Sequence, residues 1–151
     1  MSNGLVANAS TTIGAPASAV WQALVTPAAI KEYMFGTTVT STWAVGSPIT
    51  WKGEWQGRAY EDKGVILRFV PESLLQYSHF SPLAGLPDVP ENYHMVTVEL
   101  SPDGGHTHVT LSQDNNPTEE AREHSEKNWG MMLGALKAYV ERQGPGAGRP
   151  G

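Results

Sequence analysis

Residues 125–140 read SEKNWGMMLGALKAYV and hold the clearest helical pattern in the chain. Large apolar side chains recur there every three or four residues, which places one stripe along a helix: Trp129, Met132, Leu133, Leu136 and Val140. Upstream, Asn116, Pro117 and Glu119 are typical of an N-cap, a first helical position and a capping box. The sequence therefore predicts one long helix over residues 117–142 whose stripe needs an apolar partner.

The same helix contains two glycines and two methionines: Gly130, Gly134, Met131 and Met132. Glycine weakens a helix by about 1 kcal/mol relative to alanine, and methionine fills irregular space. A helix that forms one wall of a cavity needs close backbone approach in places and adaptable side chains in others, and these residues suit that role. The alternative is that both glycines face solvent or the first helix.

The rest of the chain supplies a sheet as the partner. Residues 5–13 read as a strand, and residues 15–25 and 27–34 have helical patterns with Pro near the start of each. From residue 37 to residue 113 the period changes to alternation, interrupted by turn signals rich in Gly and Pro. This order predicts an α+β helix-grip, in which a curved antiparallel sheet of six or seven strands wraps around the long C-terminal helix. Two short helices follow the first strand.

The composition is that of a single domain. The chain has 151 residues, 40% of them apolar, and no cysteine, which excludes disulfides and thiolate chemistry. It shows no signal-peptide pattern and no apolar run near the roughly 18 residues that a membrane span needs. We expect one cytoplasmic domain over residues 1–143, no membrane insertion, and a disordered Gly/Pro tail over residues 144–151.

The charge pattern argues against several partners and cofactors. The formal net charge is −5, and the ten Lys and Arg residues are scattered, so nucleic acid is not an expected partner. His106 and His108 alternate onto the outer face, and Gly104 and Gly105 read as a hairpin turn rather than a phosphate-binding loop. We therefore expect no metal site and no cofactor.

Four polar side chains fall on the otherwise apolar inner face of the predicted sheet: Tyr77, His79, His94 and Gln113. A hairpin turn centred on Asp103–Gly104 would place His94 opposite Gln113. These groups either orient a ligand in a pocket or satisfy one another near the sheet edge. Trp51 and Trp55 also alternate inward, as core residues or as cavity lining.

No catalytic group is expected from the carboxylates. Glu54 alternates onto the polar face, and with Glu61 and Asp62 it reads as solvated surface. The inner histidines then have no carboxylate beside them, whereas a general base needs a partner that orients it.

Several ordered segments resemble the SRPBCC superfamily, which contains the START and birch-pollen-allergen proteins. The segments are IGAPASAVWQALVTPAAIKEYMFG, VGSPITWKG, DKGVILRFVPESLLQYSHF, TVELSPDGGHTHVTLSQDNNP and EKNWGMMLGALK, within residues 13–140. The closest likeness is to the branch named after the activator of the ninety-kilodalton heat-shock protein's ATPase. Two positions depart from the family pattern, because His79 stands where a large aromatic is usual and Gln113 where His is frequent.

The resemblance implies a cavity between the sheet and the long helix. Its expected lining comprises Trp51, Trp55, Tyr77, His79, His94, Gln113, Trp129, Met132 and Leu133. We expect a binding module for a small, mostly apolar or amphipathic molecule, in a monomer or homodimer. The alternatives are a co-chaperone-like domain that binds a chaperone, and a cyclase- or hydrolase-like enzyme. The Pro-rich residues 81–92 are predicted to form a mobile flap at the cavity mouth.

Overall fold

The computed structural model describes residues 5–55, 57–82 and 85–143. The predicted tail at residues 144–151 lies outside this part of the chain. The elements run in the order β1 (Leu5–Ile13), α1 (Ala17–Val25), α2 (Pro27–Tyr33), β2 (Thr38–Ser41), β3 (Pro48–Trp55), β4 (Arg58–Val70), β5 (Leu74–His79), the 3-10 helix η2 (Pro90–Asn92), β6 (His94–Asp103), β7 (His106–Asn116) and α3 (Glu119–Gln143).

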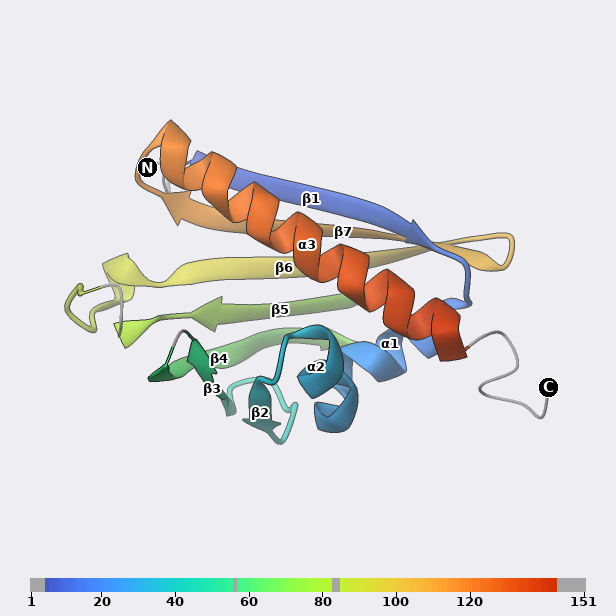
Figure 1. Ribbon diagram of the computed structural model, residues 1–151, viewed down its shortest axis with the longest axis horizontal. Helices are drawn as coiled ribbons and strands as arrows, with labels where there is room; N and C mark the ends of the chain where they lie inside the picture. The colour runs from blue at the N-terminus through green and yellow to red at the C-terminus, as the bar shows by residue number, and fades with distance from the viewer. Residues whose placement is uncertain (1–4, 56, 83–84, 144–151) are drawn as a thin grey trace.

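The described strands form a seven-stranded antiparallel sheet in the order β1-β7-β6-β5-β4-β3-β2. Helix α3 lies diagonally across one face of the sheet, and α1 and α2 lie toward its C-terminal end (Figure 1). The predicted α+β helix-grip, with two short helices after the first strand, is confirmed. Among the described residues, none of the helices has the length and hydropathy needed to cross a bilayer.

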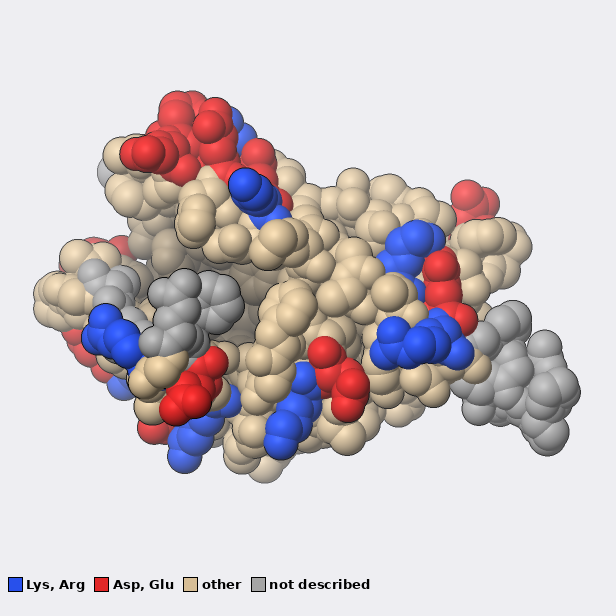
Figure 2. All heavy atoms as spheres, viewed as in Figure 1, with Lys and Arg blue, Asp and Glu red and all other residues tan. Residues whose placement is uncertain are grey.

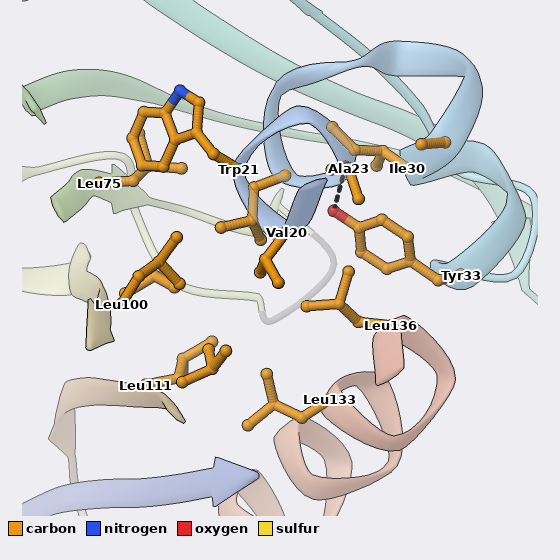
Figure 3. Packing of buried hydrophobic residues seen from close by; sticks show 14 of the residues in the cluster. Val20, Trp21, Ala23, Ile30, Tyr33, Leu75, Leu100, Leu111, Leu133 and Leu136 are labelled. Carbon is orange, nitrogen blue, oxygen red and sulfur yellow. Dashed lines mark hydrogen bonds between the residues drawn. The ribbon is translucent and has the colours of Figure 1, made fainter. Parts of the chain in front are cut away.

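The hydrophobic core lies where the stripe of α3 meets the inner face of the sheet and the two short helices. Leu133 and Leu136 of α3 are almost completely buried, together with Val20 of α1 (Figure 3). Trp21 packs edge-on against Phe69, with their ring centroids 5.2 Å apart. Each side chain of this size stabilises the fold by about 1.5–3 kcal/mol when it is fully buried. The stripe predicted from the sequence is therefore the helix's contribution to the core.

The start of α3 differs from the prediction. The helix begins at Glu119, and the Thr118 hydroxyl accepts a hydrogen bond from the Ala121 amide at 3.0 Å, so Thr118 is the N-cap. Asn116 cannot be the N-cap, because it is the last residue of β7 and its side chain forms other hydrogen bonds. Its amide donates to the Leu5 carbonyl at 2.9 Å, and its oxygen accepts from the Ser125 hydroxyl at 2.9 Å. Asn116 thus connects β1, β7 and α3.

The β6–β7 turn also differs from the prediction by one position. Asp103 pairs with His106, so the two turn residues are Gly104 and Gly105, both with positive φ. The shift preserves which residues face inward, but it pairs Gln113 with Val96. The expected His94–Gln113 pair is therefore wrong, and His94 stands opposite His79 of β5 instead.

The glycines of α3 do not make the close contacts expected of a cavity wall. Both Gly130 and Gly134 are exposed, and a Cβ atom added at either would meet open space. The solvent-facing alternative is correct for both. The glycine that does permit close approach is Gly64 of β4, where a Cβ atom would overlap the carbonyl oxygen of Ser78 on β5.

The loop after β5 is held against the outer face of the sheet in its described part. Lys63 of β4 forms an ion pair with Asp88, which also accepts a hydrogen bond from the Tyr93 hydroxyl at 2.7 Å. The Tyr93 ring stacks on Phe80 at 5.0 Å. Lys63 and Phe80 are bridge partners on the face of the sheet opposite to α3. The mobility expected of residues 81–92 stays a prediction.

Candidate functional site

A hollow of about 670 Å³ opens between the inner face of β3–β5 and the first half of α3. Figure 2 shows it as a recess below the acidic first turns of that helix. Its described lining comprises Met34, Phe35, Thr37, Trp51, Tyr60, Asp62, Tyr77, His79, Ser81, His124, Asn128, Trp129 and Met131. We call this space the hollow throughout. Its walls are mostly apolar and aromatic, as in small-molecule sites, and a few polar groups lie among them.

The rim of the hollow carries two exposed apolar side chains, Phe35 and Met131. They are 67% and 55% exposed. Phe35 projects there because α2 ends in a turn in which the Gly36 amide donates to the Lys31 carbonyl at 2.8 Å. That turn places Phe35 at φ 58°, a region that a bulky residue rarely adopts. Strained backbone of this kind concentrates at functional sites.

The floor of the hollow carries an Asp–His pair. Asp62 Oδ2 lies 2.9 Å from His79 Nε2, and the two side chains are 17% and 25% exposed. The second carboxylate oxygen, Oδ1, is buried and has no hydrogen-bond partner among the described residues. Trp51 packs edge-on against the His79 ring at 5.0 Å. The hydrogen bond to Asp62 and the contact with Trp51 therefore hold the His79 ring in place from two sides.

The position of Asp62 corrects the sequence prediction, which placed it on solvated surface and left the inner histidines without a carboxylate. Trp51 of β3 pairs directly with Asp62 of β4, and paired residues of antiparallel strands point to the same face. The signal was present in the sequence. Trp55 pairs with Arg58, and the same register pairs Trp51 with Asp62.

A second polar pair joins Thr37 to Tyr60, which is the next inward-facing residue of β4 beside Asp62 and pairs with Gly53. Their hydroxyl oxygens are 2.6 Å apart, and Thr37 also donates to the Met34 carbonyl at 2.8 Å. Since a hydroxyl has one proton, Tyr60 must be the donor to Thr37. Gly53, which is paired with Tyr60 on β3, leaves room for the phenol, because a Cβ atom there would overlap the Tyr60 hydroxyl.

Tyr77 is a neutral hydroxyl in an aromatic surrounding. Its ring lies 5.1 Å from that of Trp51, and burial raises the pKa of Tyr77 well above the ordinary value of a phenol. Tyr77 therefore keeps its proton and can donate a hydrogen bond.

The remaining predicted residues are placed differently. His94 stands beside His79, with ring centroids 6.3 Å apart, and its Nδ1–H donates to the Asp114 carbonyl at 2.9 Å. Gln113 accepts a hydrogen bond from the Trp129 indole and so fixes that wall of the hollow.

The structure brings Trp51, Tyr77, His79 and Trp129 together as lining. Met132 and Leu133 belong to the hydrophobic core. Trp55 ends β3, and its side chain lies outside what the structure describes.

The lining residues missed by the sequence analysis come mainly from two places. Met34, Phe35 and Thr37 follow α2, where irregular backbone follows no period. His124 and Asn128 lie on the flank of α3 beside its apolar stripe, and that flank reads as solvated surface in a helical pattern. Met131, which the sequence analysis named as suited to a cavity wall, does line the hollow.

The family model described as Activator of Hsp90 ATPase homolog 1-like protein matches residues 14–141. The chain is 57% identical to ChR145 from Cytophaga hutchinsonii, whose solution structure it matches over 95% of this chain and 98% of that one, with a TM-score of 0.83. No curated protein matches the chain.

Two more distant structures share the fold. The Aha1 dimer from Colwellia psychrerythraea is 21% identical over 91% of this chain and 96% of that one, with a TM-score of 0.71. CalU16 from Micromonospora echinospora is 22% identical over 89% of this chain and 74% of that one, with a TM-score of 0.67.

Proposed function

The chain belongs to the Activator of Hsp90 ATPase homolog 1-like family, and from that premise we propose that it binds a small, mostly apolar molecule in the hollow. The observation that carries this proposal is a space of about 670 Å³ with aromatic walls and a few fixed polar groups. Indole and phenol rings supply contact area with little loss of side-chain entropy. The Asp62–His79 pair and the Tyr77 hydroxyl supply polar contacts that orient one end of the ligand.

A neutral naphthalene dye such as prodan tests this proposal, because its emission shifts when it leaves water. We expect saturable binding to the wild-type protein. The Phe35→Ala variant should bind about tenfold more weakly, since the lost phenyl contact is worth about 1.5 kcal/mol or more. Val45→Ala is the matched control, because Val45 is similarly exposed but precedes β3, away from the hollow. Equal dye affinity in all three proteins would contradict the proposal.

A second candidate is contact with a chaperone, which the family description favours. Exposed Phe35 and Met131 offer apolar anchors at the rim for such a contact. Pull-down of a purified chaperone by Phe35→Ala and by Trp129→Ala separates the two functions. Loss with the first variant alone supports docking at the rim, whereas loss of dye binding with unchanged pull-down supports the hollow as a ligand site.

A further inference from the structure

We propose that Asp62 and His79 form a proton-accepting pair, in which His79 removes a proton from a molecule held in the hollow. This inference rests on the proposed function, because it needs a ligand beside the pair. His79 is the catalytic residue, and Asp62 is a positioning residue that acts through it. The substrate class is an uncharged, largely planar molecule with a weakly acidic C–H group next to a carbonyl.

The hydrogen bond between the two side chains fixes which nitrogen can act. A carboxylate only accepts, so the 2.9 Å contact requires His79 to donate through Nε2–H. The neutral imidazole then presents its lone pair at Nδ1. The side chain lines the hollow and is a quarter exposed, so the ring is accessible.

The buried carboxylate of Asp62 interacts with His79 through one oxygen only. Its Oδ1 atom is buried without a hydrogen bond, which is a rare and costly state for a carboxylate oxygen. A pair that served only to join strands would gain from a second donor at this position. The Asp62–His79 contact is not needed to join the strands, because the backbone pairs from Ile66–Tyr77 to Val70–Leu74 already join β4 and β5. The unsatisfied oxygen favours a role in polarising the imidazole.

The other charged and titratable side chains around the pair do not compete for Asp62. The described lining of the hollow contains no Lys or Arg that would neutralise Asp62. The other titratable groups of the described lining are Tyr60, Tyr77 and His124, and His94 lies beside the His79 ring. His94 donates to the Asp114 carbonyl, and the His124 ring bonds to Asn128 at 3.1 Å. In the part of the chain that the structure describes, neither of these two rings is held by a carboxylate.

The proposed step is balanced without a co-reactant. The substrate C–H bond breaks, its proton moves to His79 Nδ1, and the electron pair moves to the carbonyl oxygen as an enolate. The site then holds an imidazolium beside a carboxylate, which is electrically neutral as a pair. The Tyr77 hydroxyl is a donor on the same inner face for the developing oxyanion. Return of the proton to the same or another carbon gives exchange or isomerisation.

The probe that tests the step is 5-nitrobenzisoxazole, a neutral planar aromatic molecule. A base removes its C3 proton, the C–H electrons complete a nitrile, and the N–O bond breaks to release a coloured phenolate. We expect the wild-type protein to accelerate this reaction about a hundredfold or more over free imidazole at equal concentration. His79→Gln should lose the acceleration. Asp62→Asn should lower kcat about tenfold or more with little change in KM.

Two matched variants control for surface charge and surface imidazole. Glu61→Gln removes the neighbouring carboxylate on the outer face of β4, and His106→Gln removes an exposed histidine. Both should react like the wild type. Acceleration that survives in His79→Gln, or that falls equally in His106→Gln, would overturn the proposal.

Two further measurements separate the proton-accepting pair from the binding function. Quenching of Trp51 and Trp129 fluorescence by the nitroaromatic probe reports binding without chemistry. Binding without acceleration overturns the base and leaves the proposed function intact, whereas failure to bind both this probe and prodan overturns both. Nitrogen-15 NMR of the wild-type protein reports the tautomer of His79 without any variant. A neutral ring with its proton on Nδ1 contradicts the proposal.

Discussion

The two halves of α3 face the same sheet but have different surroundings. The C-terminal half packs Leu133, Leu136 and Val140 into a closed core with α1 and α2, whereas the N-terminal half stands over the hollow. The helix has 25 residues, or about 38 Å at 1.5 Å per residue. The two short helices cover only one end of that length (Figure 1). The hollow is therefore the part of a long groove that the short helices leave uncovered.

The largest effect is expected at the strand contact that sets the floor of the hollow. Gly64→Ala should destabilise the protein by more than about 4 kcal/mol, because the new methyl group meets the backbone of Ser78 rather than a flexible side chain. Urea unfolding followed by circular dichroism measures this change. A loss below about 1 kcal/mol would mean that β4 and β5 can separate freely at this point.

The closed half is tested by Leu136→Ala. Leu136 has no solvent exposure, so the substitution should lower the free energy of unfolding by about 2–5 kcal/mol. Met131→Ala, at the rim of the hollow, is the contrasting change and should cost less than about 0.5 kcal/mol. Similar losses in the two variants would erase the distinction between the two halves.

The Asp62–His79 pair gives an intermediate effect. His79→Phe leaves the buried carboxylate of Asp62 without its partner, which should cost about 1–3 kcal/mol of stability. Combining it with Asp62→Leu should recover most of that loss, because apolar groups then replace both members of the pair. A double-mutant cycle by thermal unfolding measures the coupling. Additive losses would show that the two side chains do not depend on each other.

The glycines of α3 give a small effect of opposite sign. Gly130→Ala should stabilise the protein by about 0.5–1 kcal/mol, since the residue is exposed and a methyl group meets nothing within 4 Å. Prodan binding should be unchanged. Destabilisation measured by the same thermal unfolding would restore the interpretation that this glycine permits a close approach.

The smallest effect is expected in the loop at residues 85–92. The Lys63 ammonium and the Tyr93 hydroxyl lower the pKa of Asp88, so the ionised carboxylate tethers the loop above the ordinary Asp range and releases it as the pH falls. Asp88→Asn should reduce hydrogen-exchange protection in the loop with little change in the core. A flap over the hollow would instead gain protection when prodan binds, whereas contact with the outer face alone predicts no change.

The fold was predictable because its signals are periodic and long. The stripe from Trp129 to Val140 and the alternation in seven strands each repeat several times, so one misplaced residue does not change the result. The N-cap was placed wrongly because Asn116 and Thr118 both suit that role locally. Only the partners of Asn116 on β1 and α3 distinguish them.

The site was less predictable because it depends on single contacts. Trp51, Tyr77, His79 and Trp129 followed from alternation and helical spacing. The inward position of Asp62 follows from the pairing register of β3 with β4, which composition alone does not give. The position of Phe35 depends on a positive φ after α2, which is unusual for a bulky residue and which a single sequence does not reveal.

The pairing of β1 with β7 limits the order in which the strands can pair during synthesis. Ile13 pairs with Thr107, and Leu5 pairs with Asn116, so 94 to 111 positions separate the partners along the chain. A ribosome adding roughly 5–20 residues per second takes several seconds to cover that distance. The hairpins from β3 to β6 join strands that are neighbours in sequence, so they can form during this time. β1 stays unpaired until β7 has been synthesised. The nascent sheet thus grows from its middle, and its first-made strand is among the last to be paired.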